Sequence, residues 1–168
     1  VDQLPTMGTA QLAALNSGAG NYAGSIITLA RAGGANVQDV FSGSGTLSLS
    51  AGVASLSGTA IASYTQNGGT LVLTFASGTT QAQLNAALSL LAYSNTSDAP
   101  PASIQIGWTF SDGNTGAQGQ DGAATTSGTT TVSITGVNDA PVISGIPASI
   151  QNITAGQAAE LADFTVAD

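Results

Sequence analysis

Short stretches in which apolar and polar residues alternate recur along most of this chain. In the clearest of them, Ile104, Ile106 and Phe110 share one parity, which predicts a strand with one buried face. Turn-forming residues separate the stretches, and Asn67-Gly68 is the strongest short hairpin signal among them. The alternation predicts strands at residues 22–30, 37–41, 46–50, 53–56, 61–64, 71–75, 104–110 and 129–135.

One segment follows a helical period instead. Leu84, Leu88 and Leu91 recur at helical spacing, and Thr79 or Thr80 can cap the start, so residues 80–91 are predicted as the single good helix. Residues 11–15 fit either a helical turn or a poor strand. Many short strands with turns between them favour a mainly β fold, an antiparallel β-sandwich with one short helix.

The stretch Gly136-Val137-Asn138-Asp139-Ala140-Pro141-Val142 divides the chain, because a new strand pattern begins directly after it. We expect an N-terminal strand or leader at 1–19, a sandwich at 20–137, a linker at 138–141 and the incomplete start of a next repeat at 142–168. This tail is too short to bury a core of its own. Its apolar strand near Phe164 therefore needs a sheet to join, on its own domain or, by self-association, on another molecule.

The charge balance narrows the function classes. Charged residues make up 6% of the chain, against about 25% in ordinary soluble domains, and the net charge is −8 with Arg31 as the only cation. Nucleic acid is therefore excluded as a partner, since nothing can neutralise its phosphates. No apolar run approaches the roughly 20 residues of a membrane span, so no membrane insertion is expected.

Several catalytic chemistries are excluded by composition. The chain has no cysteine and no histidine, which removes zinc sites, thiol chemistry and histidine-based triads. Paired carboxylates of the glycosidase type remain, but Glu160 is the only glutamate and lies in the tail. We expect no enzyme, and multivalent cations are the natural partners of such an acidic surface.

Three segments together resemble the cadherin-like repeats of very large bacterial adhesins, calcium-dependent proteins secreted by the type I route. They are Tyr93-Ser94-Asn95-Thr96-Ser97-Asp98, Trp108-Thr109-Phe110-Ser111-Asp112-Gly113-Asn114, and Val132-Ser133-Ile134-Thr135-Gly136-Val137-Asn138-Asp139-Ala140-Pro141. The resemblance implies an Ig/cadherin-like sandwich at the bacterial cell surface, a non-catalytic spacer in cell adhesion or biofilm formation. Ca²⁺ and the adjacent repeats of the same polypeptide would be its partners.

The resemblance also implies metal ligands. Asn138 and Asp139 match the central pair of the cadherin linker Asp-x-Asn-Asp-Asn-Ala-Pro, although Gly136 stands where its first Asp is expected and its second Asn is missing. Asp112 matches the acid that ends the penultimate strand, and Asp98 lies in the loop before that strand. Asp168 falls where an early paired-acid ligand begins.

Asp39, an acid in the predicted strand 37–41, is a further candidate ligand. Any single Asp in a turn can instead form an Asx-turn. The alternative function is a carbohydrate-binding or accessory module of a secreted hydrolase, which would need an exposed aromatic platform. Trp108 alternates in phase with Ile104, Ile106 and Phe110, which favours a core position for it.

Overall fold

The computed structural model describes residues 10–113, 123–137, 142–145, 155–156 and 165–167. The chain divides into two compact units, Val1–Thr135 and Gly136–Asp168. Helix α1 (Ala10–Ala14) and a short 3₁₀ turn (Asn16–Gly18) precede the strands of the first unit. The predicted linker, 138–141, lies outside the described residues.

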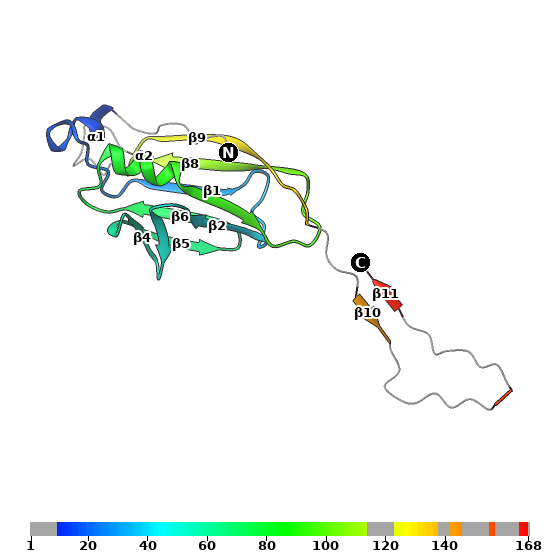
Figure 1. The fold of residues 1–168 in the computed structure, drawn as a ribbon. Coiled ribbons are helices and arrows are strands. Elements are labelled where there is room, and N and C mark those ends of the chain that lie inside the picture. The colour runs from blue at the N-terminus through cyan, green and yellow to red at the C-terminus, as the bar shows by residue number, and fades with distance from the viewer. Residues whose placement is uncertain (1–9, 114–122, 138–141, 146–154, 157–164, 168) are drawn as a thin grey trace. The chain divides into compact units, whose positions relative to one another are not determined.

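The first unit is an antiparallel β-sandwich (Figure 1), which confirms the predicted mainly β class. Its large sheet has the strand order β3-β4-β5-β6-β1-β8-β9, and a two-stranded sheet pairs β2 with β7. The strands of the large sheet are β1 (Ile26–Arg31), β3 (Leu47–Ser50), β4 (Val53–Leu56), β5 (Thr59–Asn67), β6 (Thr70–Phe75), β8 (Ser103–Ser111) and β9 (Thr125–Ser133). The small sheet consists of β2 (Asp39–Gly43) and β7 (Leu91–Asn95).

Alternating burial places the core between the layers. Leu71, Leu73 and Phe75 of β6 are buried, and the alternate residues Val72 and Thr74 are only partly buried. Phe41 of β2 joins the same cluster from the opposite layer. The remaining core residues include Ile27 and Leu29 of β1 and Ile104, Ile106 and Phe110 of β8. The two-residue period of these strands therefore builds the sandwich as the sequence predicts.

Helix α2 (Gln81–Ser89) lies over the sheet with a predicted cap. The Thr80 hydroxyl accepts from the backbone N–H of Gln83, and the Gln83 side chain accepts from the backbone N–H of Thr80, which forms a capping box. Leu84, Ala87 and Leu88 form its buried face. The prediction of a helix to residue 91 is wrong at its end, because Leu91 pairs with Gly43 as the first residue of β7.

Other predicted boundaries shift by a few residues. Strand β1 begins at Ile26 rather than at residue 22, and Tyr22 is nonetheless fully buried. Strand β2 covers Asp39–Gly43 rather than 37–41, and Val37 is exposed. Strand β9 begins at Thr125, four residues earlier than predicted, because its ladder with β8 continues as far as Ser111.

The second unit contains a small antiparallel pair. Strand β10 (Val142–Ser144) pairs with β11 (Thr165–Ala167) through Val142 and Ala167, Ile143 and Val166, and Ser144 and Thr165. Val142 and Ile143 are 63% and 53% exposed. A two-stranded sheet of this size is marginally stable at best. Within the described segments, no helix is long and apolar enough to span a membrane.

Candidate functional site

The only cation of the chain is bound to a buried acid. Arg31 at the end of β1 donates two hydrogen bonds to the carboxylate of Asp39, from Nε to Oδ2 at 3.0 Å and from Nη2 to Oδ1 at 2.6 Å. Tyr93 donates its hydroxyl to the same Oδ1 at 2.6 Å, and Asn95 donates its amide at 2.8 Å. Asp39 is 2% exposed, so these donors replace the water that its charge would otherwise require.

This Asp39 network, formed by Arg31, Asp39, Tyr93 and Asn95, links the two layers of the sandwich. Asp39 begins β2 and lies opposite Asn95, the last residue of β7, in the small sheet. Arg31 belongs to the large sheet, where it lies opposite Ile106. The Tyr93 ring also packs edge-on against Phe41, with ring centroids 5.7 Å apart. The network therefore joins the hydrogen bonds of Asp39 to the apolar core through the contact between Tyr93 and Phe41.

Burial and hydrogen bonding oppose each other at Asp39. Burial by itself would raise the pKa of Asp39, but hydrogen bonds from Arg31, Tyr93 and Asn95 outweigh it and hold the pKa below its ordinary value of 3.8. Burial, together with the hydrogen bond to Asp39, raises the pKa of Tyr93. The hydrogen bond to Asp39 likewise raises the pKa of Arg31. Because each Asp39 oxygen already accepts from a donor, a metal ion bound there would have to displace these donors.

Asp112 clamps the segment that follows β8. Its carboxylate accepts from the backbone N–H of Ala124 at 2.9 Å, and its own N–H donates to the carbonyl of Ala124. The Ser25 hydroxyl donates to the Asp112 carbonyl at 3.0 Å. Asp112 is 3% exposed. These bonds give the side chain a structural role where β8 and β9 are joined, at a position that the sequence made a candidate ligand.

The other candidate ligands are not brought together in the described structure. Asp98 is exposed in the loop after β7. Asn138, Asp139 and Asp168 lie outside the described residues. In the part of the chain that the structure describes, no three acidic side chains gather closely enough to hold a metal ion.

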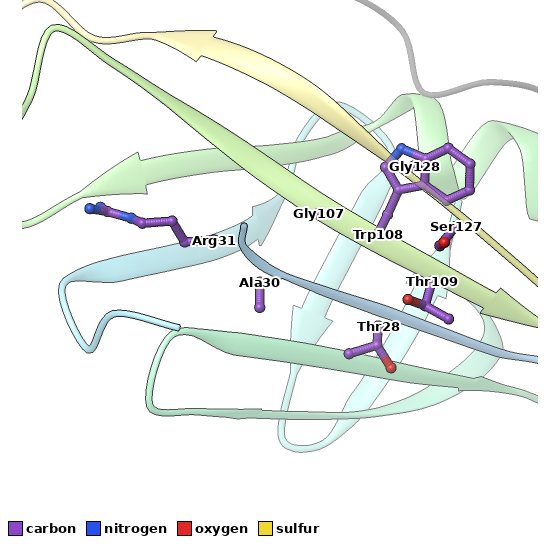
Figure 2. Close-up of a pocket in the computed structure, with 8 residues that line it drawn as sticks. All are labelled: Thr28, Ala30, Arg31, Gly107, Trp108, Thr109, Ser127 and Gly128. Atoms are coloured by element: carbon purple, nitrogen blue, oxygen red, sulfur yellow. The ribbon is translucent and has the colours of Figure 1, made fainter. Parts of the chain in front are cut away.

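A shallow hollow of about 290 Å³ lies on the large sheet over β1, β8 and β9. Figure 2 shows Thr28, Ala30 and Thr109 on one side of the sheet and Trp108 pointing to the other. The register agrees, since Thr109 lies opposite Thr28, and Trp108 lies opposite the buried Leu29. The hollow therefore has the hydroxyl groups of Thr28 and Thr109 at its walls, while Trp108, which also lines it, turns its ring toward the inner side of the sheet.

Trp108 packs on the inner side of the sheet, as its alternation predicted. A side chain at Gly128, directly opposite on β9, would collide with the indole ring. The ring is partly buried against the core cluster. Its Nε1 is buried and has no hydrogen-bond partner among the residues described. Gly128 thus provides the space in which the indole crosses β9.

No family model matches this chain, and neither does any curated protein or solved structure. Function is therefore inferred from the chain's own residues. The sequence did not predict the Asp39 network, because Tyr93 and Asn95 lie 54 and 56 residues from Asp39 along the chain. One signal was available: the only cation of the chain, Arg31, directly follows the predicted strand 22–30 and lies eight residues before the acid Asp39.

Proposed function

We propose that this chain is a non-catalytic structural repeat of a bacterial cell-surface adhesin, which acts as a calcium-stiffened spacer in cell adhesion or biofilm formation. The observation that carries the proposal is the division into a β-sandwich and a second β-unit that begins at Gly136. Two β-units in immediate succession are what a string of modules requires. The resemblance of residues 132–141 to cadherin-like repeats supports the same function.

The surface composition suits a spacer. The net charge is −8, and hydroxyl and amide side chains take the place of most charges. On the outer side of the large sheet, Thr28, Thr109 and Ser127 form one cross-strand row. A net charge far from zero keeps proteins soluble. A string of such domains would hold a terminal binding domain away from the cell and out of non-specific contacts.

The carbohydrate-binding alternative is less well supported. Sugar recognition commonly stacks an exposed aromatic ring against the ligand, whereas Trp108, the aromatic residue that lines the hollow in Figure 2, packs its ring against the core cluster. Trp108 is committed to the inner side of the sheet. Saturable binding on a glycan array would favour the alternative over the spacer.

Calcium would act at the linker. Without metal, Asn138, Asp139 and nearby acids would leave negative charge concentrated along a short linker, and the repeats on either side would swing. Pro141 restricts the residue before it to extended geometry, so a bound ion would have fewer backbone states to freeze. Carboxylate, amide and carbonyl oxygens are the ligands that Ca²⁺ prefers. Of the described candidates, Asp98 is the exposed one; with Asp168 it would complete the set.

Calorimetry on a two-repeat polypeptide tests the site. We expect saturable calcium binding with a dissociation constant of about 0.1–1 mM, the range of extracellular modules. Asp139→Ala should abolish the heat of binding. Asp121→Ala removes the same charge from the Gly- and Gln-rich segment after Asp112 and should leave binding unchanged. An Asp139→Ala protein that binds calcium as well as the parent would end the proposal.

A further inference from the structure

Strand β9 is a long edge strand whose own residues carry none of the usual protection. It ends the large sheet, and β8 is its only strand neighbour in the part of the chain that the structure describes. Its sequence from Thr125 to Ser133 contains no charged residue and no proline. Natural sheets protect exposed edges by charge, proline, bulges or short length. The opposite edge, β3, follows this rule, because it has only four residues.

The hydrogen bonds at the two ends of β9 determine which of its backbone groups bond to β8 and which point outward. The carbonyl of Ala124 accepts from Asp112, and the N–H of Ile134 donates to Ala102. In an antiparallel ladder, alternate residues direct both backbone groups to the same neighbour. Even-numbered residues of β9 therefore bond to β8. The odd-numbered residues direct their N–H and C=O groups outward: Thr125, Ser127, Thr129, Thr131 and Ser133, all exposed.

These outward groups match a second copy of themselves. Antiparallel pairing about a two-fold axis at Thr129 places Thr125 opposite Ser133 and Ser127 opposite Thr131. Each of these pairs exchanges two backbone hydrogen bonds, and Thr and Ser pairs across strands are favourable. The side chains on the edge are small and uncharged, so none of them blocks the approach.

We propose that two copies of this chain associate through β9, antiparallel and centred on Thr129, into one sheet that continues from one molecule to the other. The contact uses the same surface of both copies, so it closes as a dimer. The short β3 edge does not extend the sheet further. This interface is distinct from self-association through the tail strand, and it requires no calcium.

Two physical properties distinguish this dimer. Each copy carries a net charge of −8, so repulsion opposes association and salt should strengthen it by screening. The pairing also places Thr130 of the second copy beside Gly128, over which the indole of Trp108 lies. Trp108 is the only tryptophan, so its fluorescence should change as the dimer forms.

Light scattering and tryptophan fluorescence on the full chain test the proposal over a concentration series. We expect the mass to rise to twice the monomer value and no further, with a matching change in emission. Thr129→Glu places two like charges opposite each other and should raise the midpoint concentration on the order of tenfold or more. Thr65→Glu, an exposed position on β5, adds the same charge away from the edge and should leave the midpoint nearly unchanged.

A second pair of variants separates backbone pairing from charge. Thr129→Pro removes an outward N–H that β8 does not use, so the fold should persist and dimerisation should be lost. Thr129→Val keeps the N–H and should keep the dimer, and thermal melting verifies that both variants fold. A parent protein that stays monomeric at all concentrations, or one that grows without limit, would overturn the proposal. Loss of association in Ile143→Thr with Thr129→Glu unaffected would assign it to the tail instead.

Discussion

At Arg31 the chain places its one positive charge against a carboxylate with almost no access to water. Both Asp39 oxygens accept from the Arg31 guanidinium, and Tyr93 and Asn95 add two further donors to Oδ1. Removing one partner of a buried pair is costly because the other charge remains buried without compensation. The Asp39 network is therefore the position at which a single polar substitution should matter most.

Arg31→Met tests this expectation. It keeps much of the apolar stem but removes both guanidinium bonds, so we expect a loss of about 3 kcal/mol in the free energy of unfolding by urea denaturation. Arg31→Lys keeps the charge without the planar fork and should lose less. Equal stability of the methionine variant and the parent would show that Tyr93 and Asn95 suffice for Asp39.

Acidification offers a second test at the same residue. The pKa of Asp39 is lower in the folded protein than its ordinary value of 3.8, so the folded state favours the ionised form. This contribution to stability is complete above about pH 3.8 and is lost as the pH falls through the lower folded-state pKa. Denaturation curves between pH 2 and 6 should show a smaller acid-induced loss in Asp39→Asn than in the parent, provided that the variant folds.

Sequence patterns predicted the environment of a single residue only where the spacing of its near neighbours in the chain decides it. Trp108 was correctly expected on the core side, because its parity with Ile106 and Phe110 is a local property. Asp39 was expected as a candidate calcium ligand, and its partners Tyr93 and Asn95 come from another strand 54 and 56 residues away. No periodicity encodes which strands lie side by side, so this network required the structure.

Among the elements, the junction between β8 and β9 depends on a close approach of two backbones. Gly113 has a φ of +64°, and a Cβ there would collide with the carbonyl of Gly24. The neighbouring Asp112 is held by Ala124 and Ser25. A side chain at Gly113 would therefore displace the segment that Asp112 fixes.

Gly113→Ala should consequently destabilise the fold by clearly more than backbone strain alone. Gly78→Ala is the matched control, because Gly78 has a φ of +83° but open space around its Cβ position. The control should lose about 1–2 kcal/mol, and Gly113→Ala should lose more, as measured by thermal unfolding. Equal losses in both variants would mean that the contact with Gly24 relaxes easily.

Helices and strands were predicted well where the sequence follows one hydrophobic period, and poorly where a helical period continues into a strand. The strands at 53–56 and 71–75 and the capped helix after Thr80 follow clear local patterns. Strand β7 was not predicted, because Leu91 continues the helical spacing of Leu84 and Leu88. Pairing with β2 decides its conformation instead, and that pairing is a long-range contact that overrides local preference.

For the whole molecule, the chain divides after Thr135, whereas the sequence pattern placed the end of the sandwich at residue 137. The strand order could not be predicted in the same way, because β1 lies between β6 and β8, far from its sequence neighbours. The candidate calcium site was predicted from a resemblance in the linker, and calcium binding by a two-repeat polypeptide tests it.

Small-angle scattering on a two-repeat polypeptide examines that spacer function directly. Calcium should narrow the distribution of interatomic distances and increase the maximum dimension of the two-repeat polypeptide, because a bound ion would remove bent conformations of the linker. A chelator should reverse the change. Dimensions that do not respond to either addition would contradict a calcium-stiffened linker, whatever the calorimetry shows.

The position of Arg31 also determines when the protease trypsin can cleave these residues. Trypsin cuts after lysine or arginine, and the peptide bond between Arg31 and Ala32 is the single such bond in the sequence. The guanidinium that the protease must capture is already held by Asp39. Cleavage therefore has to wait until β1 leaves the sheet, and where opening and closing are fast its rate follows the population of opened molecules. Every molecule that trypsin cuts within these residues has first lost the contact between its layers.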